Sequence, residues 1–330
     1  MDINIAIDAL VQGKYVLVFD VYSTGLSVLK ALKQYLDQQY TQDTFNQQRE
    51  FRGKYNTLSN RLLISVSNHK LKVKKSPEIG WLKILYPSLT SFLLPFPKVQ
   101  GLNSSWQWYK KGIKIPGLNK SIKPFYDTYF PTRFEHLELF NQWLEETNIA
   151  KETAYDIGVG SGVLSLKLLQ HGFSKVIATD TNPNAIIGME NVNLSDKDGN
   201  LHLHLGHLFA NTEDLADLIV FNPPWVPLSK NIKGIDKAIF YDDQLFPDFF
   251  KQASKHLKPN GRLVLIFSNL AEVTNVTTVN PIELELLNHN RFKKDLLLTK
   301  VVTDASSKTK RNQNWRKDEL VQLWVLKLSD

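Results

Sequence analysis

The sequence predicts an α/β protein in which a doubly wound sheet domain is joined to a smaller N-terminal accessory domain. From residue 154 onward, short β-branched runs alternate with amphipathic runs, which is typical of βαβ units around a parallel sheet. A glycine-rich turn follows the first of these runs, and the first 120 residues lack the alternation. We therefore expect an accessory domain over residues 1–120 and the sheet domain over residues 121–330.

The elements of the second part follow one another in order. Residues 154–157 read as a strand, and the amphipathic run after the glycines reads as a helix that Gly172 ends. In the next helix, Pro183 suits the first turn. A turn is expected at residues 258–261, and the last two strands form a terminal hairpin. The remaining strands are expected within residues 175–180, 201–209, 217–225, 261–269, 295–302 and 319–328, with helices near 182–194 and 244–257.

The first part of the chain lacks this alternation of strand-like and helix-like runs. Residues 23–40 have helical periodicity, with Ser23 or Thr24 as the expected N-cap, and residues 61–75 read as strands. Residues 86–118 carry prolines and tryptophans without a clear period. We place the linker between the two domains near residues 116–124.

Composition narrows the function. The 330 residues include no cysteine, which excludes disulfides, thiolate metal sites and cysteine nucleophiles. The amino terminus lacks the basic-then-apolar order of a secretory signal, and no apolar run approaches the roughly 18 residues of a membrane span, so we expect a cytoplasmic protein. Lysine and arginine outnumber aspartate and glutamate by 40 to 33, which favours a polyanionic partner and also fits ordinary solvation.

The glycine turn is a candidate cofactor site. Glycine allows a sharp turn and lets a cofactor approach the backbone and the helix N-terminus. The spacing here is G-x-G-x-G after an aspartate, whereas the dinucleotide fingerprint is G-x-G-x-x-G. The residues concerned are Asp156, Gly158, Gly160 and Gly162.

An acidic residue ends the next strand. Asp180 lies 18 residues after Gly162, where a carboxylate can accept hydrogen bonds from both hydroxyls of a ribose. Alternatively, Asp180 and Asn182 cap the helix that follows. The glycine turn and Asp180 on one βαβ frame together favour cofactor binding.

The run Asn222, Pro223, Pro224, Trp225 ends the fourth strand. Ligands of open α/β sheets lie beyond the carboxyl ends of the strands, so Asn222 is expected to face the same crevice as Gly158 and Asp180. The Asn222 side-chain oxygen and the Pro223 carbonyl can accept both hydrogens of a planar –NH2 group, and Trp225 can stack on it. Holding both hydrogens aligns a delocalised nitrogen lone pair for attack on a methyl group. We assign a catalytic role to these four residues; the alternative is a rigid strand terminus with a core tryptophan.

These segments resemble class I S-adenosylmethionine-dependent methyltransferases, in the subclass that methylates exocyclic amino or amide nitrogens. The runs DIGVGSGVLSL, ATDTNPNAI and VFNPPW are similar to the first, second and fourth motifs of that class. The resemblance covers residues 131–267 well and the terminal hairpin loosely. It implies a Rossmann-like, doubly wound sheet of seven strands with the last strand antiparallel.

The resemblance also implies where S-adenosylmethionine binds. The cofactor would lie over Gly158 to Gly162, with Asp156 near its methionine portion and Asp180 on its ribose. The segment YFPTRFEHLELF, residues 129–140, is similar to the one ahead of the first motif in HemK-like glutamine methyltransferases, which helps to close over the cofactor. At the third motif this chain has His207 where relatives usually carry an aspartate, so the Leu208 backbone is the expected adenine contact. The implied cofactor-binding residues are Pro131, Thr132, Asp156, Gly158, Gly160, Gly162, Asp180, Leu208 and Asn222.

The identity of the substrate stays open between RNA and protein. The basic balance favours an exocyclic amino group of a base in rRNA or tRNA, and the motif detail favours a glutamine amide in a release factor or ribosomal protein. A catalytically silent nucleic-acid-binding module and a nicotinamide-dependent oxidoreductase are the further alternatives. Oligomeric state is not predicted.

Basic segments bear on the same question. Lys70, Lys72 and Lys74 would share one face of a strand, either to follow phosphates or to protect a sheet edge. In the loop near residues 306–319, basic residues surround Trp315, which suits phosphates and a stacked base. Histidines His202 and His204 alternate as strand residues do, and no metal site is expected.

Overall fold

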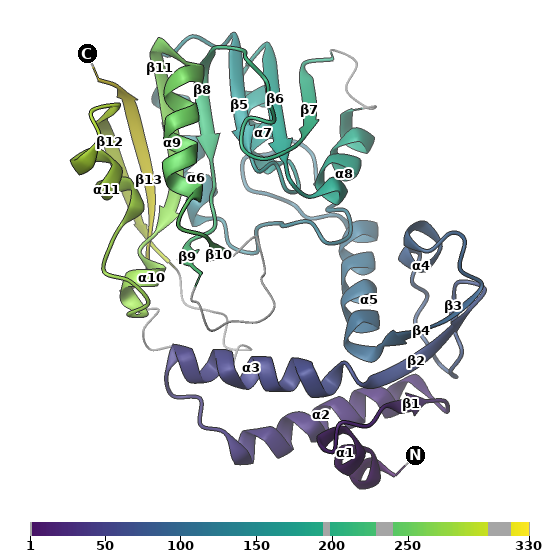
Figure 1. The fold of residues 1–330 in the computed structure, drawn as a ribbon. Coiled ribbons are helices and arrows are strands. Elements are labelled where there is room, and N and C mark those ends of the chain that lie inside the picture. The colour runs from purple at the N-terminus through teal and green to yellow at the C-terminus, as the bar shows by residue number, and fades with distance from the viewer. Residues whose placement is uncertain (1, 194–198, 229–239, 303–317, 330) are drawn as a thin grey trace. The chain divides into compact units, whose positions relative to one another are not determined.

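The structure is a computed structural model that describes residues 2–193, 199–228, 240–302 and 318–329 (Figure 1). The chain divides into two compact units, Met1–Lys111 and Gly112–Asp330, called unit 1 and unit 2 below. Among the described residues, no helix has both the length and the apolar character needed to cross a bilayer.

Unit 1 combines helices with a small mixed sheet. Its elements in chain order are α1 (Ile3–Val11), β1 (Val16–Val18), α2 (Tyr22–Gln39), α3 (Phe45–Ser59), β2 (Leu62–Ser67), β3 (Lys70–Leu71), α4 (Trp81–Leu85), β4 (Ser91–Pro95) and α5 (Phe96–Lys111). Strand β2 is central: it pairs with β1 in parallel and with β3 and β4 in antiparallel orientation. Asn68 and His69 join β2 to β3 with positive φ angles of 48° and 59°, as a tight type I′ hairpin requires.

Several expectations for unit 1 need correction. The predicted helix is α2, but its N-cap is Val21, which makes no side-chain cap; neither Ser23 nor Thr24 caps it. The proline- and tryptophan-bearing stretch without a clear period contains β4 and the long helix α5. That helix has a weakly amphipathic sequence and buries Phe96, Val99 and Leu102, so tertiary packing rather than periodicity defines it.

Unit 2 contains the predicted doubly wound sheet. Its elements are α6 (Glu135–Glu146), β5 (Thr153–Ile157), α7 (Val163–Gln170), β6 (Lys175–Asp180), α8 (Pro183–Asn193), β7 (Leu201–Leu205), β8 (Ala216–Phe221), β9 (Val226–Pro227), β10 (Phe240–Tyr241), α9 (Leu245–His256), β11 (Leu257–Ser268), α10 (Leu270–Val273), α11 (Pro281–Asn288), β12 (Phe292–Val301) and β13 (Leu320–Leu328).

The seven-stranded sheet has the order β12-β13-β11-β8-β5-β6-β7. The neighbours from β11 to β7 pair in parallel, and β13 runs antiparallel between β11 and β12. The predicted fold class, including the antiparallel last strand, is therefore confirmed. The turn expected at residues 258–261 lies instead within β11, where the pairing with β8 shifts register between Leu257 and Arg262.

Helices cover both faces of this sheet, because its central strands are apolar on both sides. On one face α6, α7 and α8 pack against alternate sheet residues such as Val220, Val264 and Ile266. On the other face α9 and α11 pack against Ile219 and Leu265. Figure 1 shows α9 lying along β11 and β8. All six residues of β8 are buried, so this strand is the centre of unit 2.

The segment expected to link the domains is part of unit 2. Ile113 and Ile122 form a β-bridge, and both are buried in the core together with Ile115. The Lys167 ammonium donates to the Pro116 carbonyl at 3.1 Å, and the Gln170 side chain donates to the Gly117 carbonyl at 2.9 Å. Both donors come from α7, so residues 113–122 are tied to the helix that follows the glycine turn.

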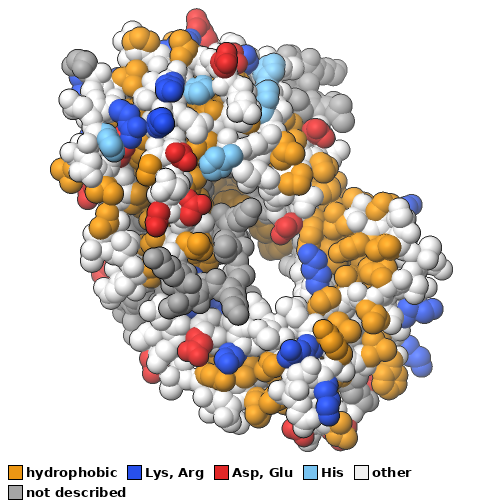
Figure 2. Space-filling model, viewed as in Figure 1, with side chains coloured by type: hydrophobic (Ala, Val, Ile, Leu, Met, Phe, Trp, Pro, Cys, Tyr) orange, Lys and Arg blue, Asp and Glu red, His pale blue; other side chains and the backbone are white. Residues whose placement is uncertain are grey.

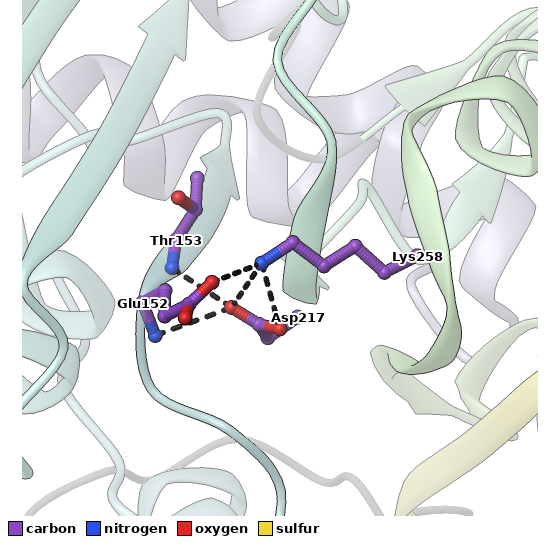
Figure 3. A network of polar contacts seen from close by, with 4 residues as sticks. All are labelled: Glu152, Thr153, Asp217 and Lys258. Atoms are coloured by element: carbon purple, nitrogen blue, oxygen red, sulfur yellow. Dashed lines mark hydrogen bonds and ion pairs between the residues drawn. The ribbon is translucent and has the colours of Figure 1, made fainter.

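A polar network connects the N-terminal ends of three neighbouring strands of the seven-stranded sheet. The candidate site lies at the other, C-terminal ends of these strands. Asp217 at the start of β8 accepts the backbone N–H groups of Glu152 and Thr153, at 3.2 and 3.0 Å (Figure 3). Lys258 then bridges the carboxylates of Glu152 and Asp217, at 2.6 and 3.0 Å. Asp217 is buried, so these bonds fix the relative positions of β5, β8 and β11.

Candidate active site

Three parallel strands end at the same level of the sheet, and each is followed by a predicted site residue. Ile157 at the end of β5 pairs with Thr179 of β6 on one side and with Phe221 of β8 on the other. The next residues along the three strands are Gly158, Asp180 and Asn222. The register therefore brings these three residues together at the carboxyl edge of the sheet, where ligands of open α/β folds bind.

The glycine turn has the conformation that its sequence requires. Gly158, Gly160 and Gly162 have φ angles of 74°, 50° and 79°, which favour glycine. At Gly162 the packing is also close, because an added Cβ would lie 2.2 Å from the Met189 sulfur. Helix α7 begins directly after this glycine, so its first N–H groups lie beside the turn.

Asp156 lies beneath the turn and is fully buried. Ser165 donates both its backbone N–H, at 2.8 Å, and its hydroxyl, at 2.6 Å, to the Oδ2 atom of Asp156. The other oxygen, Oδ1, has no hydrogen-bond partner among the residues that the structure describes. Burial raises the pKa of Asp156 to about 6, a rise that the Asp180 charge supports and the Ser165 hydrogen bonds oppose.

Asp180 connects the glycine turn to the next helix. Its Oδ2 atom accepts the Gly160 N–H at 2.9 Å, and its Oδ1 atom accepts the Asn182 N–H at 2.8 Å. Burial raises the pKa of Asp180, while these backbone hydrogen bonds lower it. Asp180 fixes the turn ahead of α8, and Asn182 caps that helix by accepting the Asn184 N–H at 3.0 Å. Each Asp180 oxygen also keeps lone-pair capacity for a ligand hydroxyl, so both alternatives are compatible with the geometry.

Asn222 and Trp225 interact directly. The Trp225 indole N–H is shared between the Asn222 side-chain oxygen, at 3.2 Å, and the Ile266 carbonyl, at 3.3 Å. The indole packs against the hydrophobic core residues on both faces of the seven-stranded sheet. It meets the buried His136 ring edge-on, with the ring centroids 6.0 Å apart. Its polar edge and much of its ring are thus turned into unit 2. Between these two residues, Pro223 is buried and Pro224 half-buried.

The segment before α6 reaches the same site. An added Cβ on Gly160 would lie 3.1 Å from the Tyr129 carbonyl oxygen, so this tyrosine lies directly against the glycine turn. Loss of solvent around its hydroxyl raises the pKa of Tyr129, and a hydrogen bond with the Asn222 side chain partly offsets the rise. Tyr129 therefore contacts both the glycine turn and Asn222. Of the two predicted residues in this segment, Pro131 is buried and Thr132 exposed.

The third motif lies at the side of β6. Leu208 is buried with a positive φ of 49°, and its carbonyl accepts the Thr179 hydroxyl at 2.5 Å. Its backbone is thus fixed next to the end of β6, one residue from Asp180. The His207 side chain is exposed.

Other candidate residues lie elsewhere. Lys70, Lys72 and Lys74 are exposed in unit 1, although β3 itself covers only Lys70 and Leu71. The basic residues around Trp315 lie outside the described residues. Within the described ranges, no cluster of three or more histidine, aspartate or glutamate side chains has the arrangement of a metal site.

Sequence reasoning missed three residues of the site. Ser165 is the partner of Asp156, Thr179 fixes Leu208, and His136 supports Trp225. Tyr129 and His136 both lie in the segment 129–140 that resembles the HemK-like enzymes, but the sequence predicted no individual role for either residue. Ser165 follows Asp156 by nine residues in the first turn of α7, and only a three-dimensional arrangement reveals this contact.

The fold and the site together define a class of protein. A glycine turn, a buried aspartate below it and an acidic end of the second strand form a nucleotide-type cofactor site. The neighbouring asparagine with two prolines offers amide and carbonyl acceptors. This combination is typical of enzymes that transfer a group from a nucleotide cofactor to an –NH2 group.

Comparison with known proteins gives the family. The methyltransferase small domain profile matches residues 137–293. A protein from Methanocaldococcus jannaschii named for protein N5-glutamine methyltransferase activity is 26% identical over 178 residues, which cover 52% of this chain and 86% of that protein. The tRNA1(Val) (adenine(37)-N6)-methyltransferase of Flavobacterium psychrophilum is 30% identical, over 50% of this chain and 74% of the relative.

Two other similar proteins are named for methylation of ribosomal protein L11. The ribosomal protein L11 methyltransferase of Alkaliphilus metalliredigens is 33% identical, but the match covers only 60% of it and 51% of this chain. The crystal structure of a ribosomal protein L11 methylase from Lactobacillus delbrueckii subsp. bulgaricus aligns with a TM-score of 0.41 and 18% identity, over 65% of this chain and 83% of that one.

The chain belongs to the class I S-adenosylmethionine-dependent methyltransferases that carry the methyltransferase small domain. The family resemblance of its motifs is thereby confirmed, and the protein is an N-methyltransferase by family.

The residues present fit S-adenosylmethionine. The Asp156 Oδ1 atom is buried without a partner in the described part of the chain, which suits the cationic amino-acid end of this cofactor. The carboxylate of Asp180 suits its ribose, and the glycine turn leaves the backbone accessible.

Proposed function

We propose that this protein transfers a methyl group from S-adenosylmethionine to an exocyclic amino group of a base in RNA, either rRNA or tRNA. The observation that carries the proposal is the register that places Asn222 beside Gly158 and Asp180, because it brings an amide acceptor to the edge of the cofactor site. The net charge of +7 and the relative that acts on a tRNA adenine support RNA as the substrate.

In this proposal the cofactor residues are Asp156, Asp180, the three glycines, the Leu208 backbone, Pro131, Thr132 and Asn222. The cofactor supplies an electrophilic methyl group. Asp156 pairs with its cationic amino-acid end, and Asp180 accepts its ribose hydroxyls. Tyr129 lies against the glycine turn and borders that side of the site.

Asn222 and Pro223 hold the substrate nitrogen. One lone pair of the Asn222 oxygen faces the Trp225 indole, and the second accepts one substrate N–H. The Pro223 carbonyl accepts the other N–H. With both hydrogens held, the nitrogen lone pair is aligned with the methyl group, and the proton leaves after transfer because the methylated nitrogen is then acidic. Pro224 keeps the backbone rigid, and Trp225 orients Asn222.

A second candidate is methylation of a glutamine side-chain amide in a release factor or ribosomal protein. A specific observation favours it: the relative named for protein N5-glutamine methylation matches over 86% of its length. The planar amide presents the same two hydrogens to Asn222 and Pro223. Either substrate would place the protein with the translation apparatus, and a cytoplasmic location follows from the proposal.

Radiolabelled methyl transfer distinguishes the two substrates. The full chain is incubated with labelled S-adenosylmethionine and fractionated extract, and the labelled fraction is digested with nuclease or protease. Nuclease-sensitive label supports the RNA proposal, and protease-sensitive label overturns it in favour of glutamine. Absence of label in both, together with retained cofactor binding in titration calorimetry, would indicate a catalytically silent module.

A further inference from the structure

The sheet of unit 1 has one buried face and one open face. In β2, Leu62, Ile64 and Val66 are fully buried, while the residues between them are half-buried. Val18 of β1 and Leu94 of β4 pair with or neighbour this buried set, so the helices of unit 1 cover that face. Paired residues point to the same side of a sheet, so Leu17, Leu63 and Pro95 lie in one row across the open face.

Large apolar side chains are exposed on the open face. Tyr15 and Phe19 flank β1 and are 72% and 67% exposed, and Leu17 between them is 42% exposed. Leu17 alternates with Val16 and Val18, which pair with the buried Leu62 and Ile64, so it lies on the open face, and Tyr15 and Phe19 are the residues directly before and after this strand. Leu93 of β4, which pairs with Ser65, is 52% exposed on the same face. Two exposed aromatic rings at the two ends of one short strand, with an exposed leucine between them, exceed the scattered single apolar residues of an ordinary surface.

Basic residues border this face. Lys70 pairs with Ser67 and is exposed, and Lys72 lies two residues further on the same side. Lys14 is exposed next to Tyr15. None of the residues at positions 14–19, 61–67, 70–75 and 91–95 is acidic. Figure 2 shows hydrophobic side chains intermixed with lysine and arginine on the visible surface of unit 1.

We propose that the open face of the unit 1 sheet binds single-stranded RNA, with Tyr15 and Phe19 stacking on bases and Lys14, Lys70 and Lys72 contacting phosphates. The inference rests on the proposed function in that it assigns the substrate-binding surface of an RNA methyltransferase. Sheet faces that carry exposed aromatic rings bind unstacked bases, because every base has a π-face for stacking. Phosphates require cations without competing carboxylates, as on this face.

A protein partner fits this face less well. The core of a protein interface is depleted in lysine, whereas here lysines border the exposed rings at one side of a small sheet. A second copy of the chain would bring like charges together. Single-stranded RNA offers bases that stack on the exposed rings and phosphates that pair with the lysines.

Fluorescence anisotropy of the full chain with a labelled 12-nucleotide single-stranded RNA, without cofactor, tests the proposal. We expect Tyr15→Leu/Phe19→Leu to weaken binding at least about tenfold, because leucine keeps the apolar area but removes the stacking plane. Lys70→Ala/Lys72→Ala is expected to reduce the slope of log Kd against log salt concentration by about 1.4, because each single-strand phosphate contact contributes about 0.7 and two contacts are lost. Tyr35→Leu and Lys30→Ala/Lys33→Ala, exposed on α2, are matched controls that leave binding unchanged.

Two results would overturn the proposal: no binding by the unchanged chain at 100 μM protein, roughly the weak end of non-specific affinity, or equal weakening by the α2 controls. Sedimentation that shows a dimer lost in Tyr15→Leu/Phe19→Leu, with RNA binding retained, would assign the face to a second copy instead. Because no methyl transfer is measured, RNA binding can hold while the transfer experiment identifies a glutamine substrate, so the two proposals fail separately. Circular dichroism confirms that each variant is folded.

Discussion

The Trp225 indole N–H donates to the side-chain oxygen of Asn222 at 3.2 Å, so the last residue of the Asn-Pro-Pro-Trp run orients the first. The same N–H also reaches the Ile266 carbonyl, and the ring meets His136 edge-on. The sequence predicted a flat stacking surface for substrate at this position. The structure gives the indole a supporting role toward the asparagine, which leaves its stacking on a substrate as an untested prediction.

Replacing Trp225 by phenylalanine tests this role. The variant keeps the aromatic packing against His136 but removes the N–H, so the Asn222 side chain loses one hydrogen bond that fixes its orientation. We expect kcat to fall about 10- to 100-fold, as for a misplaced catalytic contact. The Kd of S-adenosylmethionine should stay within a factor of two to three of the original. Calorimetry and steady-state rates measure the two quantities.

Asn222→Ala provides the reference variant. It removes the acceptor itself, so turnover is expected to fall by more than about 100-fold. Cofactor affinity should fall far less, because the other eight proposed cofactor residues remain. A Trp225→Phe variant with full activity would show that the indole hydrogen bond does not position Asn222.

Asp156 gives a prediction in which stability and cofactor binding change in opposite directions. Its pKa in the folded chain is about 6, above the ordinary value of 3.8. Because the folded pKa is raised, the ionised carboxylate destabilises the fold: this penalty is absent below pH 4, grows as the pH rises to 6 and is complete above. Asp156→Asn is therefore expected to raise the free energy of unfolding at pH 7 by about 1 to 3 kcal/mol.

The same substitution removes the charge that is proposed to pair with the cofactor. We expect its Kd for S-adenosylmethionine to rise at least about tenfold. The affinity of the original chain should decrease as the pH falls through about 6, while that of Asp156→Asn stays flat over this range. Chemical denaturation and titration calorimetry at pH 5 and 7 are the measurements. A variant that is less stable and binds the cofactor as well as before would contradict both assignments.

The parts of the fold that are dictated locally could be predicted from the sequence. The glycine spacing predicts the positive φ angles of Gly158, Gly160 and Gly162, and the alternating apolar runs predict the strands of the sheet. The site required more. The double hydrogen bond from Ser165 to Asp156 and the contact of Tyr129 with Gly160 depend on how a helix and a preceding loop meet the turn. No spacing rule in one chain contains that information.

His136 predicts an acid-sensitive packing around Trp225. The ring is buried, and burial lowers the pKa of His136 from 6.5 to about 4, although the Glu135 charge raises it. With a depressed folded pKa, the stabilisation is fully present above pH 6.5 and is lost as the pH falls toward 4. Over this range about 3 kcal/mol is expected to disappear.

His136→Leu keeps an apolar side chain at this position and removes the titrating group. The stability of this variant, measured by urea denaturation between pH 7 and pH 4, is therefore expected to fall less than that of the original chain. Because Asp156 acts with opposite sign between pH 4 and 6, the comparison is sharpest in an Asp156→Asn background. Parallel loss of stability in both chains would show that His136 is not the acid-sensitive group.

The boundary between the two units gives the last prediction. The change in sequence pattern predicted a boundary after residue 120. In the structure, Ile113 and Ile115 are buried in the core of unit 2, and the Pro116 carbonyl accepts a hydrogen bond from Lys167. A fragment that starts at Lys120 lacks these contacts, including two isoleucine side chains worth roughly 1.5 to 3 kcal/mol each.

A fragment of residues 112–330 is therefore expected to fold cooperatively and to bind S-adenosylmethionine as tightly as the full chain, because every proposed cofactor residue lies within it. Residues 120–330 should be less stable by roughly 3 to 6 kcal/mol, the burial of Ile113 and Ile115, which is enough to unfold many domains of this size. Thermal melts with and without cofactor compare the two fragments.

The longer fragment should also lose methyl transfer to the macromolecular substrate, because the recognition surface proposed for unit 1 is gone. Equal stability of both fragments would mean that residues 112–119 are a linker after all, and undiminished methyl transfer by residues 112–330 would mean that unit 1 has no part in recognition.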